Sequence, residues 1–186
     1  IDDDGHLLVF YGSHQSPHQL ARSKAPYDVT AWEDLGEMDD VPNGTYPYPL
    51  CYEGDIYVLY RTAPSWSNPE YPSAQFATIV RSTDGGDSFE DLGPVVDSSG
   101  HPDDVSVTYP MCFTERDDRF HVSWFLVTDH ATPVTAASQH RAGIYHATYD
   151  PADGSISGLD GSTFETPVTW EEFDDSILEV SGRIDV

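Results

Sequence analysis

The chain has 186 residues, of which 38% are hydrophobic and 12% aromatic, a composition typical of a folded domain and not of a disordered chain. Eight lysine and arginine residues stand against 33 aspartate and glutamate residues, so the formal net charge is −25. Such a surface repels phosphate groups, which excludes nucleic acid and anionic membranes as partners, and it fits a halophilic source because molar salt screens the repulsion.

The two cysteines, Cys51 and Cys112, allow one disulfide at most and specify no multi-cysteine zinc site. No apolar run approaches the roughly 20 residues that span a bilayer, and no basic leader precedes an apolar segment. The chain starts at Ile1, directly before the turn-forming residues 2–5. We therefore expect the N-terminus to be truncated.

Short apolar runs rich in Val, Ile, Tyr and Phe, bounded by Gly, Pro, Asp and Asn, predict β-strands along the whole chain. No segment keeps a 3.6-residue apolar period over three turns, so we expect almost no helix. The clearest strands, in chain order, are predicted at residues 7–11, 56–60, 76–81, 120–126 and 144–149. These observations indicate an all-β fold.

Two pairs of segments repeat at similar spacing, which indicates internal repeats. Thr-Tyr-Pro at 45–47, ahead of the strand at 56–60, returns as Thr-Tyr-Pro at 108–110, ahead of the strand at 120–126, at an offset of 108 − 45 = 63. The Arg-Ser pair at 22–23 returns at 81–82, at an offset of 81 − 22 = 59. Each unit therefore contains several short strands joined by acidic turns.

Residues 82–89 read Ser-Thr-Asp-Gly-Gly-Asp-Ser-Phe, which matches the Asp-box of BNR repeats, Ser-x-Asp-x-Gly-x-x-aromatic. This pattern predicts a turn between two strands, away from any cleft. Asp84 can accept backbone N–H groups, Gly85 and Gly86 permit positive φ angles, and Phe89 can pack under the next strand. Residues 24–32 look like a degenerate copy of the same turn.

Repeats of this kind are typical of β-propellers, whose blades contain four short antiparallel strands in about 40 to 50 residues. At that size the chain holds about three to four blades, whereas propellers close with about four to eight. We therefore predict that residues 1–186 form one segment of a larger propeller. Loop insertions are expected at residues 63–73 and 129–141.

Three local patterns resemble the propeller-fold polysaccharide lyases of the ulvan-lyase kind. A strand ends in Tyr-Gly-x-His at His14, Thr-Tyr-Pro contains Tyr46, and the strand at 57–61 ends in Arg61. The resemblance implies an active-site histidine, a catalytic tyrosine and a carboxylate-binding arginine at these positions. Another active-site histidine of that family, in an Asp-His-Asn segment, would precede Ile1. The resemblance thus implies a lyase in the intact parent protein, extracellular or at the cell surface, acting on a uronate-containing, ulvan-like polysaccharide.

The same three residue types fit β-elimination on chemical grounds. A base must remove the weakly acidic proton α to the uronate carboxylate, and cations bound to that carboxylate stabilise the charge that develops. Tyrosine, with an ordinary pKa of about 10, becomes a usable base when nearby cations favour its phenolate. Tyr46, Arg61 and His14 supply these groups, although a buried strand-entry tyrosine and a buried ion pair are alternative interpretations of Tyr46 and Arg61.

Further side chains are candidates for substrate binding: Tyr109, His121, His18 and Arg22. Tyr109 repeats Tyr46 in the next unit, and His121 lies inside a predicted strand. No metal site is predicted at His130, His140 or His146, because no other metal-binding residues lie at a diagnostic spacing from them. No cofactor is predicted, and a structural metal ion stays an open alternative.

Two other functional classes compete with the lyase. A sialidase-like glycoside hydrolase also uses Asp-box propellers, but any carboxylate pair chosen among 33 acids carries little information. A non-catalytic sugar-binding or structural propeller is the third class. Convergence of Tyr46, Arg61 and His14 on one site would favour the lyase.

Overall fold

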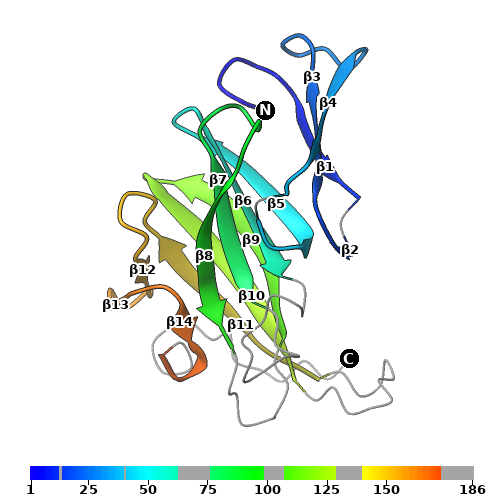
Figure 1. Cartoon of the computed structure of the whole chain (residues 1–186). Coiled ribbons are helices and arrows are strands. Elements are labelled where there is room, and N and C mark those ends of the chain that lie inside the picture. Colours follow the sequence, from blue (N-terminus) through cyan, green and yellow to red (C-terminus); the bar gives the residue numbers. More distant parts are fainter. Residues whose placement is uncertain (13, 40, 63–75, 99–106, 129–139, 173–186) are drawn as a thin grey trace, which may run out of the picture. The chain divides into compact units, whose positions relative to one another are not determined.

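The structure, a computed structural model, describes residues 1–12, 14–39, 41–62, 76–98, 107–128 and 140–172 (Figure 1). The fold is all-β, and among the described residues helix is confined to 170–172. The predicted insertions at 63–73 and 129–139 lie outside the described residues, whereas residues 140–141 belong to a strand. The strands are β1 (Leu8–Tyr11), β2 (His14–Ser16), β3 (Gln19–Ser23), β4 (Trp32–Glu37), β5 (Gly44–Tyr52), β6 (Asp55–Thr62), β7 (Ala77–Ser82), β8 (Glu90–Asp97), β9 (Val107–Arg116), β10 (Arg119–Thr128), β11 (His140–Tyr149), β12 (Ile156–Ser157), β13 (Thr163–Phe164) and β14 (Val168–Thr169).

All five strands that the sequence predicts most clearly are confirmed, as β1, β6, β7, β10 and β11. The chain divides into two compact units, which are described separately. The first consists of Ile1–Ala63 and Thr78–Gly93, and the second of Pro64–Ala77 and Pro94–Val186.

The first unit contains a three-stranded antiparallel sheet in the order β1-β3-β4 and a second sheet in which β7, β6, β5 and β2 are neighbours. Its core is a cluster of buried side chains from β6, β7 and the segment that follows β4, against which the partly buried Leu8 and Phe10 of β1 pack: Met38, Val41, Ile56, Val58, Tyr60 and Val80. Gly44 lies against the Tyr60 ring, where an added Cβ would be 2.2 Å from a ring carbon. Only glycine therefore fits beside this core tyrosine.

The second unit is a sheet in the order β13-β12-β11-β10-β9, and β14 pairs in parallel with the last residues of β8. Side chains of β10 alternate between full and partial burial, as expected for a strand with two different faces. One face carries the fully buried Phe120, Val122, Trp124 and Leu126. The other face carries His121, Ser123 and Phe125, which are partly exposed.

The repeat predicted from the Thr-Tyr-Pro segments is confirmed as two long hairpins, β5–β6 and β9–β10. Both hairpins turn through two residues with positive φ, Glu53 and Gly54 in one, Asp117 and Asp118 in the other. Two such residues are the hallmark of the tight turn that matches the twist of antiparallel strands.

The Asp-box forms the predicted turn between β7 and β8, and its side chains hold it closed. Asp84 accepts hydrogen bonds from the Ser88 backbone N–H at 3.0 Å and the Ser88 hydroxyl at 2.6 Å. These bonds lower the pKa of Asp84 to about 2. Gly85 and Gly86 have φ angles of 76° and 99°, and Phe89 packs against the core cluster. The degenerate copy at 24–32 likewise joins two strands, β3 and β4.

Aspartates accept backbone N–H groups in several turns of both units, and Asp34 and Asp91 do so inside the strands β4 and β8. In each case an aspartate accepts a backbone N–H from a residue two positions further on, an arrangement that stabilises turns. Such acceptors are Asp28, Asp34, Asp91, Asp150, Asp153 and Asp160. Several of the acidic side chains therefore stabilise the backbone directly, as hydrogen-bond acceptors.

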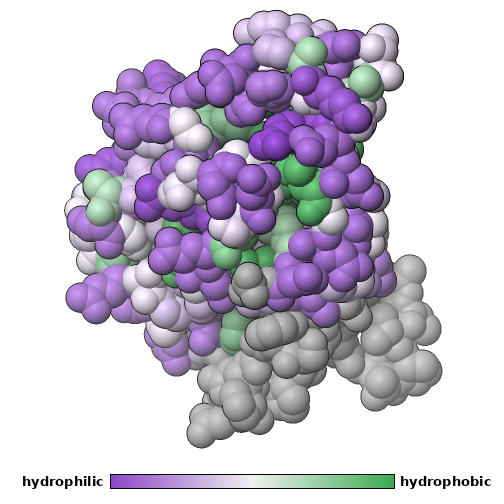
Figure 2. Space-filling model, turned by 45° about the horizontal axis from the view of Figure 1, so that its top comes forward, coloured by the Kyte–Doolittle hydropathy of each residue, from purple (hydrophilic) through white to green (hydrophobic). Residues whose placement is uncertain are grey.

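The described residues on the face drawn in Figure 2 form a largely hydrophilic surface. Both cysteines, Cys51 and Cys112, are free thiols, so the disulfide that their number allowed is not formed. Within the described ranges, no helix has the length and hydropathy needed to cross a membrane.

Candidate functional site

Arg61 lies near the end of β6, a strand that runs between β5 and β7 and whose side chains are buried on both faces from Ile56 to Thr62. Only 4% of the Arg61 surface is exposed. A charged side chain on such a strand has little freedom to move, since its neighbours on both sides are packed. The strand therefore presents the guanidinium group from a rigid element, as a binding site requires.

Tyr46 occupies an irregular position in the neighbouring strand. The pairing of β5 with β6 is regular from Tyr48 to Tyr52 and is broken by a bulge between Thr45 and Tyr48. Pro47 cannot donate a ladder hydrogen bond, which accounts for the break. Tyr46 has a φ of 61°, a conformation that costs a non-glycine residue about 1–3 kcal/mol and concentrates at functional sites.

The bulge brings Tyr46 over Arg61. The guanidinium carbon of Arg61 lies 5.0 Å from the centroid of the Tyr46 ring, within the range of a cation–π contact. Tyr46 is 45% exposed whereas Arg61 is 4% exposed, so the ring is the outer partner of the pair. The two residues that the sequence proposed as base and carboxylate ligand are thus in contact.

His14 lies in the same row of the sheet. The short strand β2 pairs with the edge of β5, with His14 opposite Thr45, and Thr45 is in turn opposite Arg61. Directly opposed residues of neighbouring strands share a face, and strands are about 4.8 Å apart, so the His14 and Arg61 backbones are separated by about 10 Å. His14 is exposed.

His18 is placed differently from the other predicted site residues. It follows β2, is 1% exposed, and packs edge-on against the Tyr60 ring with 4.6 Å between centroids. Within the part of the chain that the structure describes, neither ring nitrogen has a hydrogen-bond partner. Burial lowers the pKa of His18 to about 4. A role in substrate binding stays a prediction for His18.

This burial makes the protein sensitive to acid. His18 binds a proton near pH 6.5 in the unfolded chain but only near pH 4 in the folded protein. Its contribution to the free energy of unfolding is therefore fully present above pH 6.5 and is lost as the pH falls toward 4, by roughly 3 kcal/mol in all. We expect His18→Phe to flatten the pH dependence of the unfolding free energy in urea between pH 7 and pH 4. His14→Gln, at an exposed histidine, should leave it unchanged. Equal pH dependence in the wild type and His18→Phe would contradict this prediction.

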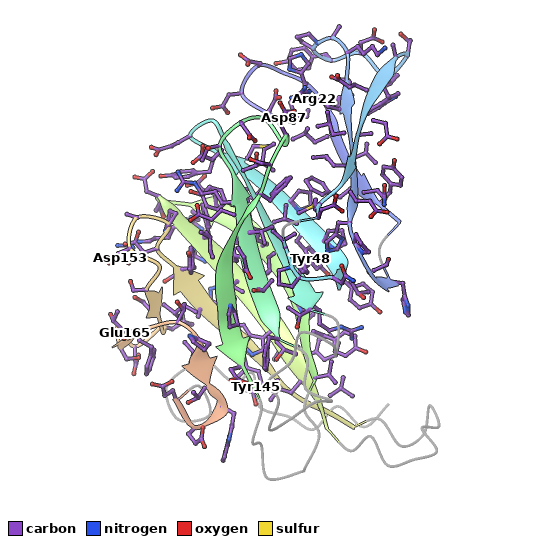
Figure 3. All side chains as sticks on the ribbon, in the orientation of Figure 1. Arg22, Tyr48, Asp87, Tyr145, Asp153 and Glu165 are labelled. Atoms are coloured by element: carbon purple, nitrogen blue, oxygen red, sulfur yellow. The ribbon has the colours of Figure 1, made fainter. Side chains whose placement is uncertain are left out.

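Arg22 belongs to the turns of the first unit. It donates to the Gly85 carbonyl oxygen at 3.0 Å and to the Glu33 carboxylate at 3.2 Å. Its guanidinium also lies 3.8 Å from Asp87, and both residues are labelled in Figure 3. These contacts connect the β3–β4 hairpin to the Asp-box turn. A role in substrate binding stays a prediction for Arg22.

Tyr109 and His121 belong to the second unit. Tyr109, although it repeats Tyr46 in sequence, stacks on Phe125 with 4.9 Å between ring centroids and 5° between ring planes. His121 contacts His146. Burial and the neighbouring His121 ring together lower the pKa of His146. The substrate contacts of Tyr109 and His121 also stay predictions. The contact with His146 was missed, because the sequence does not give the register between β10 and β11 that brings the two residues together.

No group of three or more histidine, cysteine, aspartate or glutamate side chains suited to a metal ion occurs among the described residues. His130 lies outside that part of the chain, and the His140 side chain is not described.

Comparison with known proteins places these features in context. A family model described as a BNR repeat-containing family member matches residues 1–183. The chain is 26% identical over 215 aligned residues to Ulvan Lyase-PL25 of Pseudoalteromonas sp. (strain PLSV) and 27% identical over 215 residues to an ulvan lyase of Alteromonas sp. (strain LOR). Each alignment covers 96% of this chain and 39% of the relative. The chain therefore spans about two fifths of the length of these curated relatives.

Solved structures give the same picture for the fold. A PL25 ulvan lyase bound to -[GlcA(1-4)Rha3S]- superimposes with a TM-score of 0.77 at 23% identity, covering 97% of this chain and 44% of that chain. The polysaccharide lyase Uly1 superimposes with a TM-score of 0.62 at 11% identity, covering 95% and 44%.

Proposed function

The chain belongs to the BNR repeat-containing family, and from this premise we propose that the intact protein is a polysaccharide lyase that cleaves a uronate-containing, ulvan-like polysaccharide by β-elimination. The two ulvan lyases that align with 96% of the chain support this choice of reaction. Because the chain spans 39% of their length, the proposal concerns the parent protein.

The proposed reaction removes a proton and a leaving group from one sugar. A base takes the proton on C5, next to the carboxylate, and the electron pair of that C–H bond forms a C4=C5 double bond. The bond from C4 to the glycosidic oxygen breaks, and that oxygen leaves with the neighbouring sugar, gaining a proton. No oxidant, reductant or water is consumed, and the product is an unsaturated uronate.

We assign the base to Tyr46 and carboxylate binding to Arg61 and His14. The observation that carries the assignment is the bulged Tyr46 ring, exposed to solvent and lying 5.0 Å from the buried Arg61 guanidinium. A guanidinium beside the ring stabilises negative charge both on the phenolic oxygen and on the substrate carboxylate. His14, across β5 from Arg61, would bind the other side of the carboxylate.

The architecture that we propose for this site is a partial propeller with four-stranded blades. Strands β5 to β8 are neighbours in chain order, as are β9 to β12, and each set would form one blade. The sheet β1-β3-β4 would be three strands of another. The Asp-box then lies between the last two strands of a blade, and β5, which carries Tyr46, is the first strand of its blade.

The charge of −25 conflicts with a polyanionic substrate unless the field is local and screened. In the proposed site the guanidinium of Arg61 supplies a local positive charge within an acidic surface, and molar salt shortens the Debye length to about 3 Å. We therefore propose a halophilic source and an extracellular or cell-surface location, where a polysaccharide is met. Nucleic acid and membranes are not among the proposed partners.

Product chemistry tests the proposal directly. Digestion of a glucuronate-containing algal polysaccharide by the intact protein should produce reducing ends together with ultraviolet absorbance from the new C=C bond. The two measurements should rise in equal molar amounts. Reducing ends without absorbance would show a hydrolase instead, and binding without new ends would show a sugar-binding propeller; either outcome overturns the lyase.

A further inference from the structure

We propose that His121 and His146 form a binding site for one divalent transition-metal ion on the partly exposed face of the second unit. The two residues are on neighbouring strands, β10 and β11, and their rings stack with 5.2 Å between centroids. Their facing nitrogens, His121 Nδ1 and His146 Nε2, are 3.2 Å apart.

The nitrogen spacing fits a shared metal ion. Zinc binds histidine nitrogen at about 2.0–2.1 Å, so two nitrogens of a tetrahedral site are about 3.4 Å apart. An octahedral ion with the same bond length separates adjacent nitrogens by about 3.0 Å. The observed 3.2 Å lies between these values, so small ring movements suffice to bind the ion.

Ser123 supports the ring orientation that the site requires. Its hydroxyl oxygen lies 3.0 Å from His146 Nδ1, and it is directly opposite His146 in the strand register. If Nδ1 carries the proton and donates it to Ser123, Nε2 keeps its lone pair free toward His121. Metal-binding histidines usually have such an oxygen on their second nitrogen, and its loss weakens binding by about 10–100-fold.

Exposure leaves the site open. His121 and His146 are both partly exposed on the same sheet face, and they are the two protein ligands that we assign. Water would complete the coordination, because no group of three candidate ligands gathers within the described ranges. Imidazole nitrogen selects Zn²⁺, Ni²⁺ or Cu²⁺ over the oxygen-preferring Mg²⁺ and Ca²⁺.

Titration with Zn²⁺ in a large excess of Mg²⁺ tests the site, because Mg²⁺ occupies the many surface carboxylates. Calorimetry should show one Zn²⁺ per chain, and the melting temperature should rise with Zn²⁺ concentration. His121→Gln and His146→Gln should each weaken binding at least about 10-fold, and Ser123→Ala should weaken it about 10–100-fold. His6→Gln is the control and should bind normally. No Zn²⁺ uptake above the Mg²⁺ background, or unchanged binding by His146→Gln, would overturn the proposal.

A second measurement needs no substitution. Paramagnetic Co²⁺, added to the unmodified protein under the same conditions, should shift or broaden the ring proton resonances of His121 and His146 before those of other histidines. If other histidine rings respond first, the site is wrongly assigned.

Discussion

Tyr46→Phe in the intact protein should reduce kcat for polysaccharide cleavage by at least about 100-fold, because general base catalysis by a positioned side chain contributes about 10²–10⁴-fold. The substitution removes only the phenolic hydroxyl and keeps the ring over Arg61, where the contact distance is 5.0 Å. The melting temperature and the affinity for substrate should therefore change little. Initial rates of ultraviolet absorbance increase are the measurement.

A matched control is present in the same strand. Tyr48, two residues further along β5, is paired opposite Leu59 beyond the bulge, and Tyr48→Phe should retain most of the activity. If Tyr46→Phe remained nearly as active as Tyr48→Phe, Tyr46 would not be the base. The lyase proposal itself would survive that result provided that the unsaturated product still formed.

Arg61→Lys should reduce kcat/KM by about 10²–10³-fold, comparable to the loss of one donor that stabilises developing charge. Lysine keeps the positive charge but loses the planar group that can bind a carboxylate through two nitrogens and stack on a ring. Both KM and kcat should change, because a carboxylate ligand acts in the bound state and in the transition state. Steady-state kinetics with the same absorbance assay will separate the two constants.

Arg81 provides the control for Arg61. It too lies over a tyrosine ring, 5.8 Å from the centroid of Tyr57, and it pairs with Asp55 at 2.6 Å. Arg81→Lys changes an equivalent arginine–tyrosine contact away from the proposed site, so it should affect the melting temperature more than the kinetics. Equal kinetic losses in the two variants would indicate that Arg61 acts only through stability.

Much of the fold could be predicted because its determinants are local in the sequence. The strand at 120–126, the repeated Thr-Tyr-Pro segments and the Asp-box turn each depend on a short stretch of neighbouring residues, and all are confirmed. Strand pairing in the sheets depends on register instead. The register is set by turns and by loops of variable length, so the sequence left it open.

The candidate site, like the fold, was predictable in part. Tyr46 and Arg61 were selected on their motifs, and the prolines of the segment 45–49 account for the bulge that brings them together. The buried position of His18 was not predictable, because a polar residue beside Pro17 is more often exposed. Likewise, the shared Thr-Tyr-Pro pattern does not distinguish Tyr46 from Tyr109. The difference comes from the bulge in β5 at Tyr46 and from Phe125, which stacks on Tyr109.

The aspartates that close the turns have a consequence for engineering this protein. On the proposal of a halophilic source, a variant designed to fold in dilute buffer would need fewer negative charges, yet the acids are not equivalent targets. Exchange of Asp84 or Asp153 for lysine removes an acceptor of backbone N–H bonds as well as a charge, and the turn would loosen. Asparagine keeps the acceptor oxygen at such positions. A variant designed for low salt should therefore carry asparagine at the aspartates within the turns, and lysine only at acids that accept no backbone hydrogen bond.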